Sequence, residues 1–494
     1  MPFPIQCLVA RPESSLGADD WTLFGASGSN LIVQSCNGAT SEWSEQIGQA
    51  RSQEDEESEG PPGKRIKLEQ PKGQKSTFAN LILSHDGKYL VGVTGEDKCI
   101  RVFQIDAEMQ LHQLSERCMS RRPSSITITS DDSTILCADK FGDVYALPLL
   151  PSPEDEQSQT QAPDEPKDKE WTPSATTLTV HSGRNRRTLD DQLKQKAKGL
   201  AKSKEPMRFK HDLLLGHVSM LTDVVYAKQG SHTFIITADR DEHIRISRGQ
   251  PQAHIIEGFC FGHTSFISKL CLTPSGLLVS GGGDDDLFVW DWHHYELLTK
   301  LPIRQLAYDF ANTNPDTRSL GTYATDFKVA VSGIWGGAVQ GDVTEILVAC
   351  ESVPALFFYK VGGRSHDGSY VPLQGNPLDV ALIRTSPNVS SLVVSVDTVH
   401  KPGSSMELRD DHVSPLQCFS KCGADAWVED TSLRNRLNWF ELRGAELPAQ
   451  ASITEVTVDN ASGNGTSQRS AEGKTLRDIL YSIENLRKRP GAEE

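Results

Sequence analysis

The most regular set of polar side chains in this sequence joins a histidine, a serine, an aspartate and a tryptophan: His263, Ser280, Asp284 and Trp290. The chemistry that these residue types can do together is hydrogen bonding in a buried chain. The carboxylate holds the imidazole, the imidazole holds the serine hydroxyl, and the hydroxyl accepts the indole N–H. Such a chain fixes a four-stranded unit against the loop before it, so these residues are predicted to be structural.

A second copy of the segment begins at His217, 46 positions before His263 (263 − 217). When the copies are aligned, Thr237 takes the place of the serine, Asp241 that of the turn aspartate and Ser247 that of the tryptophan. We therefore predict that Asp241, His217 and Thr237 form the same kind of chain. A Gly-His, a hydroxyl residue, a turn aspartate and a closing Trp-Asp, in that order, are the WD-repeat pattern, in which each repeat forms one blade of a β-propeller.

Short apolar runs separated by Asp-Gly, Gly-Gly and Ser-Asp-Asp turns fill most of the remaining sequence, and this pattern is typical of β-strands. "LILSHDGKYLVGV" (81–93) is one such strand, turn and strand. Weaker copies follow the two good repeats, and "AYDFANTNP…KVAVSGIW" (307–335) is interpreted as one of them by its strand rhythm. At about 40–50 residues per blade, the predicted fold is all-β: a seven-bladed WD40 β-propeller over residues 1–458.

Three stretches have no apolar period that could bury a face, so they are predicted to be disordered insertions or linkers. They are residues 41–76, 151–210 and 459–474. After the last of them, "TLRDILYSIENLRKR" (475–489) carries an apolar stripe at helical spacing. Residues 459–494 are therefore predicted to be a flexible linker followed by a C-terminal helix.

Two charges in the second repeat are not explained by the hydrogen-bond chain. Glu242 stands at the tip of the predicted turn, and Arg245 alternates with Ile244 and Ile246 along the strand after it. Side chains alternate between the two faces of a strand, so Arg245 is expected to reach solvent or a partner rather than the core. A solvated pair of charges and a partner contact both fit this pattern.

Four segments give the chain a more specific resemblance: "ADKFGDVYALPL" (138–149), "LLGHVSMLTDV" (214–224), "ITADRDEHIRIS" (236–247) and "FCFGHTSFISKL" (259–270). In sequence, order and spacing they resemble the WD-repeat non-catalytic subunit of the eukaryotic tRNA (guanine-N7) methyltransferase. The first segment is a poor WD repeat, so its match is more specific than propeller periodicity alone. The resemblance covers about residues 80–300 and is loose beyond them.

The resemblance implies a function as a scaffold. In that family the propeller binds the methyltransferase subunit through its charged turn, which places Glu242 and Arg245 on the contact pair and makes Lys140 a further candidate. The catalytic subunit would use S-adenosylmethionine to form N7-methylguanosine in the tRNA variable loop. The tRNA would be bound indirectly, or through weak phosphate contacts of the basic run at residues 184–210.

The chain itself shows no enzyme motif. No strand is followed by G-x-G-x-x-G, and neither H-E-x-x-H nor G-x-S-x-G occurs, so no cofactor or metal is expected. The ten cysteines are scattered and are expected to be reduced thiols. The sequence contains no run of 18 apolar residues, so no membrane span is predicted. The net charge of -16 argues against nucleic-acid binding over the whole surface.

Two alternatives stay open at this point. A generic WD40 adaptor, such as a ubiquitin-ligase substrate receptor or a chromatin scaffold, fits any propeller. A propeller enzyme would need convergent carboxylates or histidines near the ring axis, which the sequence does not show. Separately, Lys64, Arg65 and Lys67 in "PPGKRIKLEQ" resemble a nuclear import signal, so the expected location is the nucleus.

Overall fold

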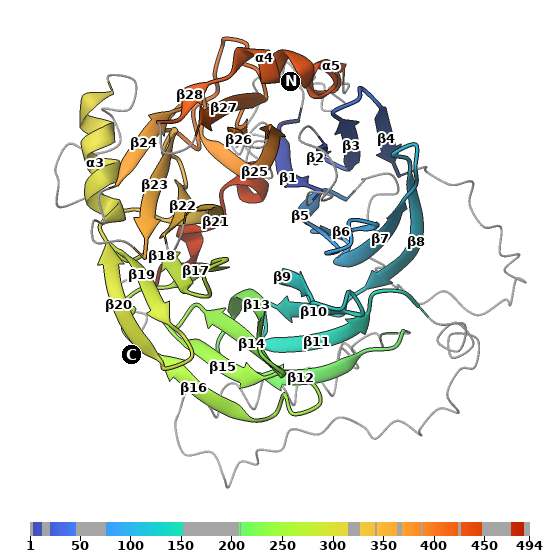
Figure 1. Cartoon of the computed structure of the whole chain (residues 1–494), viewed down its shortest axis with the longest axis vertical. Helices are drawn as coiled ribbons and strands as arrows, with labels where there is room; N and C mark the ends of the chain where they lie inside the picture. Colours follow the sequence, from blue (N-terminus) through green and yellow to red (C-terminus); the bar gives the residue numbers. More distant parts are fainter. Residues whose placement is uncertain are drawn as a thin grey trace, which may run out of the picture.

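Seven four-stranded antiparallel sheets form a closed ring in the computed structural model (Figure 1). The structure describes residues 3–11, 20–45, 76–151, 207, 209–314, 327–340, 343–362, 368–386, 389–422, 426–446 and 476–488. Every sheet is built from four strands in chain order, so each is one blade. The predicted seven-bladed β-propeller is confirmed.

The strands of the first four blades have these bounds. Blade 1 contains β1 (Ile5–Ala10), β2 (Thr22–Ser27), β3 (Asn30–Ser35) and β4 (Thr40–Ser44). Blade 2 contains β5 (Phe78–Leu83), β6 (Tyr89–Thr94), β7 (Cys99–Ile105) and β8 (Leu111–Cys118). Blade 3 contains β9 (Pro123–Ile128), β10 (Thr134–Asp139), β11 (Asp143–Pro148) and β12 (Asp212–Gly216). Blade 4 contains β13 (Leu221–Gln229), β14 (His232–Asp239), β15 (Ile244–Arg248) and β16 (Ile256–Cys260).

The last three blades complete the ring. Blade 5 contains β17 (Ile267–Leu272), β18 (Leu278–Gly282), β19 (Leu287–Asp291) and β20 (Glu296–Leu301). Blade 6 contains β21 (Val331–Gln340), β22 (Val343–Cys350), β23 (Ala355–Val361) and β24 (Ser369–Pro372). Blade 7 contains β25 (Pro377–Ser386), β26 (Val389–Val396), β27 (Leu416–Cys422) and β28 (Val428–Glu429).

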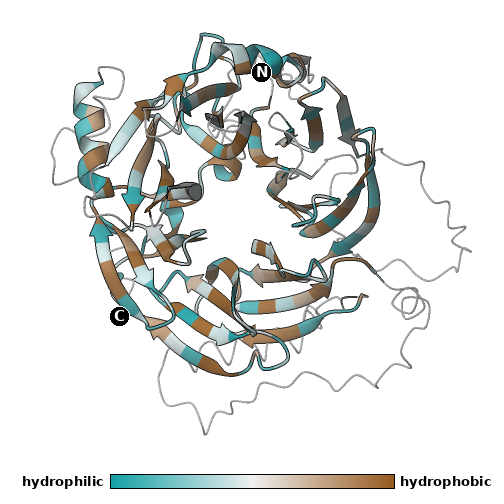
Figure 2. Ribbon diagram, viewed as in Figure 1, coloured by the Kyte–Doolittle hydropathy of each residue, from teal (hydrophilic) through white to brown (hydrophobic). Residues whose placement is uncertain are grey.

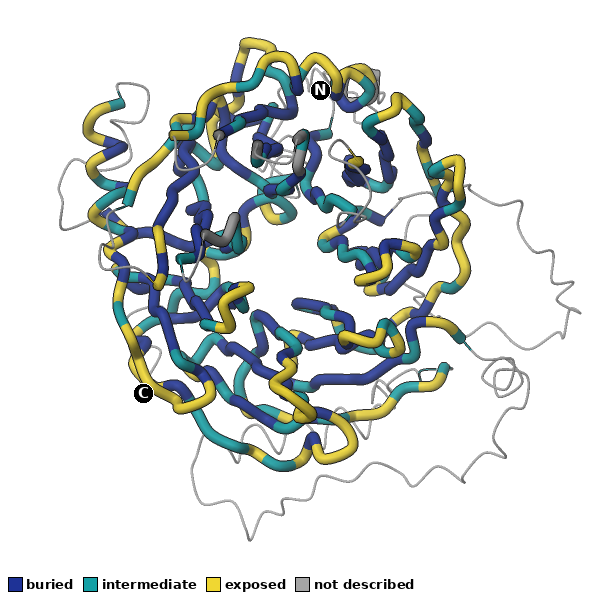
Figure 3. Tube along the Cα trace, viewed as in Figure 1, coloured by how far each residue is buried: buried dark blue, intermediate teal, exposed yellow. Residues whose placement is uncertain are grey.

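The apolar core lies between neighbouring blades. One cluster joins Ile236 and Ile246 of blade 4 to Leu270, Phe288 and Trp290 of blade 5. Apolar residues run along the strands of every blade, and the middle strands are the most deeply buried, whereas β8 and β20 at the outer edge carry many exposed residues (Figures 2 and 3). Burial on both faces explains why β22 ends in the continuous apolar run Ile346–Cys350.

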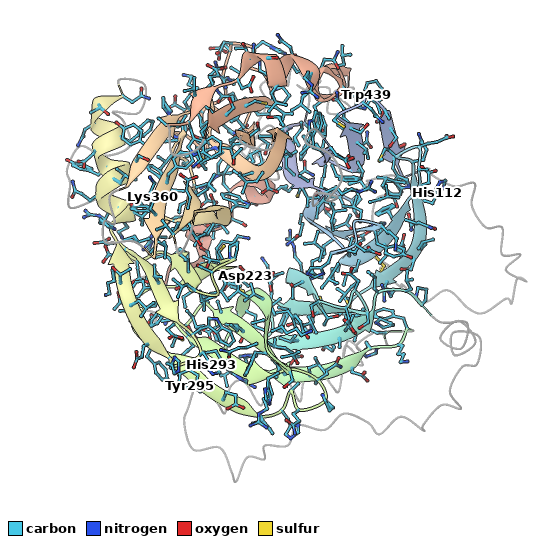
Figure 4. All side chains as sticks on the ribbon, in the orientation of Figure 1. His112, Asp223, His293, Tyr295, Lys360 and Trp439 are labelled. Atoms are coloured by element: carbon cyan, nitrogen blue, oxygen red, sulfur yellow. A yellow bond between two sulfur atoms is a disulfide. The ribbon has the colours of Figure 1, made fainter. Side chains whose placement is uncertain are left out.

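Side chains on the innermost strands tie several blades to their neighbours. Asp379 of β25 accepts the backbone N–H of Leu8 in β1 at 2.8 Å, and this bond closes the ring between its first and last blades. Asp223 of β13 accepts the Ser125 hydroxyl of blade 3 at 2.6 Å and the Leu270 N–H of blade 5 at 2.8 Å. Asp223 stands beside the centre of the ring (Figure 4). These bonds make the ring one continuous body.

The strand rhythm predicted over 307–335 is wrong in its first part, which α3 (Ile303–Thr313) occupies, and right in its second part, where β21 begins at Val331. Ile303, Ala307 and Phe310 recur at helical spacing and pack against blade 6. The sequence pattern does not predict the short helices α4 (Thr431–Arg436) and α5 (Asn438–Glu446). α4 packs against β27 of blade 7 and α5 against β3 of blade 1, and Phe440 is fully buried between these blades. Among the described residues, no helix is long and apolar enough to cross a membrane.

Three further expectations need correction. The first insertion begins later than residue 41, because β4 runs to Ser44. The C-terminal helix is shorter than expected: the helix runs over residues 476–480 and is followed by the 3-10 turn η2 (Glu484–Leu486). The cysteines are not all free thiols, since Cys99 and Cys118, direct cross-strand partners in β7 and β8, form a disulfide.

Candidate partner-docking surface

The hydrogen-bond chain of blade 5 is complete. His263 Nδ1 lies 2.7 Å from Asp284 Oδ2, and its Nε2 lies 2.7 Å from the Ser280 hydroxyl, which also accepts the Trp290 indole N–H at 2.8 Å. Burial alone would raise the pKa of Asp284, but hydrogen bonds from His263 and Thr264 hold it below its usual value. All four side chains serve the fold and are closed to a substrate.

The chain of blade 4 differs from the prediction at Asp241. His217 Nε2 bonds the Thr237 hydroxyl at 2.9 Å, but its Nδ1 faces the Gly142 carbonyl of blade 3 at 3.0 Å instead of a carboxylate. The turn aspartate that organises this blade is Asp239, whose Oδ1 accepts the N–H groups of Asp241 and His243 at 2.8 and 3.0 Å. The structural role predicted for Asp241 is therefore wrong.

Arg245 lies two residues before Ser247, which takes the tryptophan position of blade 4. Its Nε donates to the Ser247 hydroxyl at 3.0 Å, and one terminal nitrogen donates to the Gly216 carbonyl at 3.0 Å. The side chain is half-buried between blades 3 and 4, so the expectation of a freely solvated head is only partly right. Among the described residues, no carboxylate lies within ion-pair distance of it, and burial lowers its pKa.

Blade 2 shows what the same position looks like when its charge is balanced. Arg101 in "EDKCIRVF" matches Arg245 in "RDEHIRIS" and lies opposite Gly92, as Arg245 lies opposite Thr237. It is buried and paired with Asp97 at 2.7 Å, Glu116 at 3.3 Å and Glu45 at 3.5 Å. Three acids therefore surround one arginine in blade 2, and the described part of blade 4 offers its counterpart none.

Burial and the positive charge of Arg245 both shift the pKa of the neighbouring His217. Burial, and next the positive charge of Arg245, lower the pKa of His217 to about 4. The imidazole is therefore neutral at physiological pH. A neutral ring can bond both the Gly142 carbonyl and the Thr237 hydroxyl without adding a second cation beside the guanidinium.

Glu242 occupies the tip of the β14–β15 turn with φ +76°, in the left-handed region that non-glycine residues seldom adopt. Its carboxylate lies 3.5 Å from the Lys488 amine, and Asp241 lies 3.2 Å from the same amine. The neighbouring His243 ring packs edge-on against Phe261, with centroids 6.2 Å apart. Acidic and aromatic groups thus meet at this turn.

Lys140 lies on the corresponding turn of blade 3, between β10 and β11, and is exposed. The adjacent Phe141 is 59% exposed, and the Arg121 guanidinium lies 3.8 Å above its ring. The turn is tied to blade 4, since the His217 N–H donates to the Gly142 carbonyl at 2.8 Å. The candidate residues of blades 3 and 4 therefore lie on neighbouring turns at one edge of the ring.

Exposed apolar side chains accompany the charged residues Lys140, Glu242 and Arg245. Val218 follows the blade 4 histidine and is fully exposed, and Phe261 at the end of β16 is 66% exposed and stacks on Phe259. We call the following set the docking surface: Lys140, Phe141, Val218, Glu242, Arg245 and Phe261. Exposed aromatic residues beside a desolvated arginine are the features of a protein–protein contact.

Sequence reasoning found the charged members of this surface and missed the apolar ones. Phe141 and Val218 sit inside the quoted segments, but exposure cannot be derived from strand alternation when a residue lies in a turn. The import-signal residues Lys64, Arg65 and Lys67 lie outside the described residues, as does nearly all of the basic run. Phe209, near its end, packs against the core between blades 2 and 3 rather than offering a stacking platform for a base.

In the described part of the chain, potential metal ligands come together at one place. One group of three potential metal ligands is present there: Cys99, Glu116 and Cys118. Its two sulfur atoms belong to the disulfide, so they are not thiolates that could bind a metal. What the arrangement can do chemically is bind a protein that carries an acidic group and an apolar surface.

Comparison with known proteins identifies related chains. Residues 23–419 match the family model described as tRNA methyltransferase TRM82 WD40 domain. The chain is 58% identical to "tRNA (guanine-N(7)-)-methyltransferase non-catalytic subunit TRM82" of Phaeosphaeria nodorum over 100% of both chains. It is 39% identical to the protein of that name in Aspergillus oryzae over 85% of this chain and 80% of the relative. Among solved structures, U3-55K matches with a TM-score of 0.51 and 15% identity over 84% of this chain and 94% of that one, which shows the fold alone.

Proposed function

Because the chain belongs to the TRM82 WD40 family of non-catalytic subunits of tRNA (guanine-N7) methyltransferase, we propose that it binds the catalytic subunit through the docking surface and stabilises it in its active conformation. The family membership confirms the resemblance found in the sequence. The chain accordingly acts as a subunit rather than as an enzyme in its own right. The proposal adds which surface binds the catalytic subunit and how that binding activates it.

The surroundings of Arg245 are the reason for choosing this surface. Arg245 is a half-buried cation with no carboxylate partner among the described residues, although the equivalent Arg101 has three. A buried charge is costly unless it is paired. A partner acid that reaches Arg245 would supply the missing charge, and Glu242 offers a site for a cation of the same partner. The exposed rings of Phe141 and Phe261 supply the apolar area.

The proposed mechanism is a population shift in the partner. Bonds between the innermost strands hold the seven blades as one body, so the docking surface presents a fixed shape. If the active arrangement of the partner's catalytic loops fits that shape better than the inactive one, binding favours the active arrangement. S-adenosylmethionine and the target guanine of the tRNA variable loop would then be bound by the partner. Basic residues of this chain would add at most weak phosphate contacts.

We place this complex in the nucleus on the strength of the basic cluster at Lys64, Arg65 and Lys67. A generic adaptor for ubiquitin ligases or chromatin is the competing hypothesis. Recovery of tagged chain from cells separates the two, because only the proposed function requires a small S-adenosylmethionine-dependent methyltransferase among the bound proteins.

The direct test of the surface is Arg245→Gln. Glutamine can still donate to Ser247 or to the Gly216 carbonyl, so the fold is kept while the charge is removed. Truncating one partner of a buried interfacial charge pair costs about 2–5 kcal/mol, so affinity for the catalytic subunit should fall by about thirtyfold or more. Affinity is measured by calorimetry with purified proteins.

Arg248→Gln is the matched control, because Arg248 lies at the other end of β15 and already pairs with Glu257 and Gln252. It should bind the catalytic subunit as wild type does. Unchanged binding by Arg245→Gln, or equal losses in the two variants, would contradict the assignment of this surface.

A further inference from the structure

The C-terminal segment, residues 476–488, is anchored at several points on blades 4 to 7 of the ring. Its first anchor is Tyr481, which is buried in blade 7. The Tyr481 hydroxyl donates to Asp397 and accepts an amide N–H of Asn376 at 2.9 Å, and its ring packs edge-on against His400 with centroids 5.4 Å apart. In Figure 1 this segment, in red, lies near β21 and β25.

Blades 5 and 6 provide the middle anchors. Glu351 accepts the N–H groups of Ile483 and Glu484 at 3.0 and 2.7 Å, which satisfies the start of η2. Arg487 donates to the Gly283 carbonyl at 3.0 Å and to the Val329 carbonyl at 2.8 Å. Both contacts bind backbone of the ring, so the segment is held in one register rather than lying loosely on the surface.

The segment ends on the docking surface itself. Arg240 donates to the Leu486 carbonyl at 2.7 Å, and Lys488 pairs with Asp241 at 3.2 Å and Glu242 at 3.5 Å. Three consecutive residues of the β14–β15 turn therefore contact the segment. This turn contains Glu242 in its left-handed conformation, a backbone state that persists only where the surroundings hold it.

We propose that the C-terminal segment is a positioning clamp that holds the β14–β15 turn, and Glu242 on it, in the shape that the catalytic subunit binds. This inference rests on the proposed function and adds Tyr481, Arg487 and Lys488 as positioning residues. The segment also lies close to Lys140 of the docking surface, since Ile483 and Leu486 line one pocket together with it. It therefore borders the docking surface on the turns of both blade 3 and blade 4.

The test uses the full-length chain with Lys488→Glu and Tyr481→Phe. Lys488→Glu places a third negative charge beside Asp241 and Glu242, and Tyr481→Phe removes the hydroxyl of the distant anchor. Two quantities are measured: hydrogen exchange of the backbone amides of residues 241–243 in the free chain, and affinity for the catalytic subunit. We expect Lys488→Glu to speed the exchange and to weaken binding by about three- to tenfold. Tyr481→Phe should change both in the same direction.

Lys401→Glu is the control, since Lys401 pairs with the exposed Glu407 at 3.2 Å on blade 7, away from the docking surface. It should alter neither quantity. Exchange and affinity that stay within about twofold of wild type in both test variants would overturn the clamp, and so would tighter binding, which would make Lys488 a competitor of the partner. If wild type binds no methyltransferase, the proposed function fails, while the exchange rates still decide whether the segment holds the turn.

Discussion

Two arginines at equivalent positions of different blades have opposite surroundings. Arg101 is enclosed and neutralised by Asp97, Glu116 and Glu45, so it is a structural ion-pair centre. Arg245 bonds a hydroxyl and a carbonyl, which satisfy donors but supply no opposite charge. Because both arise from the same strand pattern, the sequence motif cannot distinguish them. The difference depends on which neighbours the fold supplies.

The turn of blade 4 gives a prediction at the same scale, on the two aspartates. Asp239 is buried and accepts two backbone N–H groups, so Asp239→Ala should lower the free energy of unfolding by about 1–3 kcal/mol. Asp241 is half-exposed and pairs with a surface lysine, so Asp241→Ala should change it by about 0.5 kcal/mol or less. Denaturant unfolding followed by circular dichroism compares the two. Equal losses of unfolding free energy in the two variants would show that Asp241 has the structural role predicted for it from the sequence.

At the scale of elements, the docking surface is made by turns that regular strands hold in place. The β10–β11 and β14–β15 turns come from neighbouring blades, and the bond from His217 to the Gly142 carbonyl fixes one against the other. This junction depends on a neutral imidazole, because a charged ring would stand beside Arg245. The surface should therefore respond to acid through His217.

The pH dependence has a definite sign. The pKa of His217 is about 4 in the folded chain and near 6.5 when the chain unfolds. Between these values the unfolded chain binds more protons, so stability is full above about pH 6.5 and declines as pH falls toward 4. In His217→Gln this contribution is absent.

The measurement is unfolding free energy at pH 7 and at pH 5 for both proteins. Wild type should lose more stability than His217→Gln over this interval. An equal loss, or a larger one in the variant, would show that the imidazole is charged in the fold or does not couple to it.

How far the sequence predicts the elements depends on where their apolar residues face. Alternation and the turn aspartates were enough for the strands of blades 4 and 5. The segment at 307–315 failed because it leaves out Ile303, the first residue of the buried helical stripe Ile303, Ala307 and Phe310, so the helical period of α3 does not show within it. The C-terminal segment has helical spacing over its whole length, yet the helix ends before Tyr481. The Tyr481 side chain enters blade 7, where its hydroxyl is hydrogen-bonded to Asp397 and Asn376. Tertiary hydrogen bonds of this kind leave no local signal.

At the scale of the whole molecule, repeats made the propeller predictable and left its surface unpredicted. Recurrence of the Gly-His and turn-aspartate pattern fixes the blade, and blade size then gives seven of them. No periodicity tells which edge of the ring lacks charge balance or carries exposed rings such as Phe141 and Phe261. The resemblance of four segments points to one edge through Glu242 and Arg245, and the structure shows exposed apolar residues and the C-terminal segment beside them.

The ring as a whole is proposed to act on a reaction that it does not perform. At the junction of blades 3 and 4 it carries Arg245, a half-buried cation for which the described residues supply no carboxylate. If the partner performs the chemistry and this chain holds it in the active form, methyl transfer to tRNA should require both proteins together.

Methyl transfer to tRNA by purified components tests this claim most directly. The chain alone, the catalytic subunit alone and the two together are each incubated with labelled S-adenosylmethionine and tRNA, and N7-methylguanosine in the variable loop is quantified. We predict no product with the chain alone, and a rate with both proteins that exceeds the catalytic subunit alone by at least about tenfold, as expected when binding shifts a largely inactive population. Product from the chain alone, or an equal rate with and without it, would contradict the account.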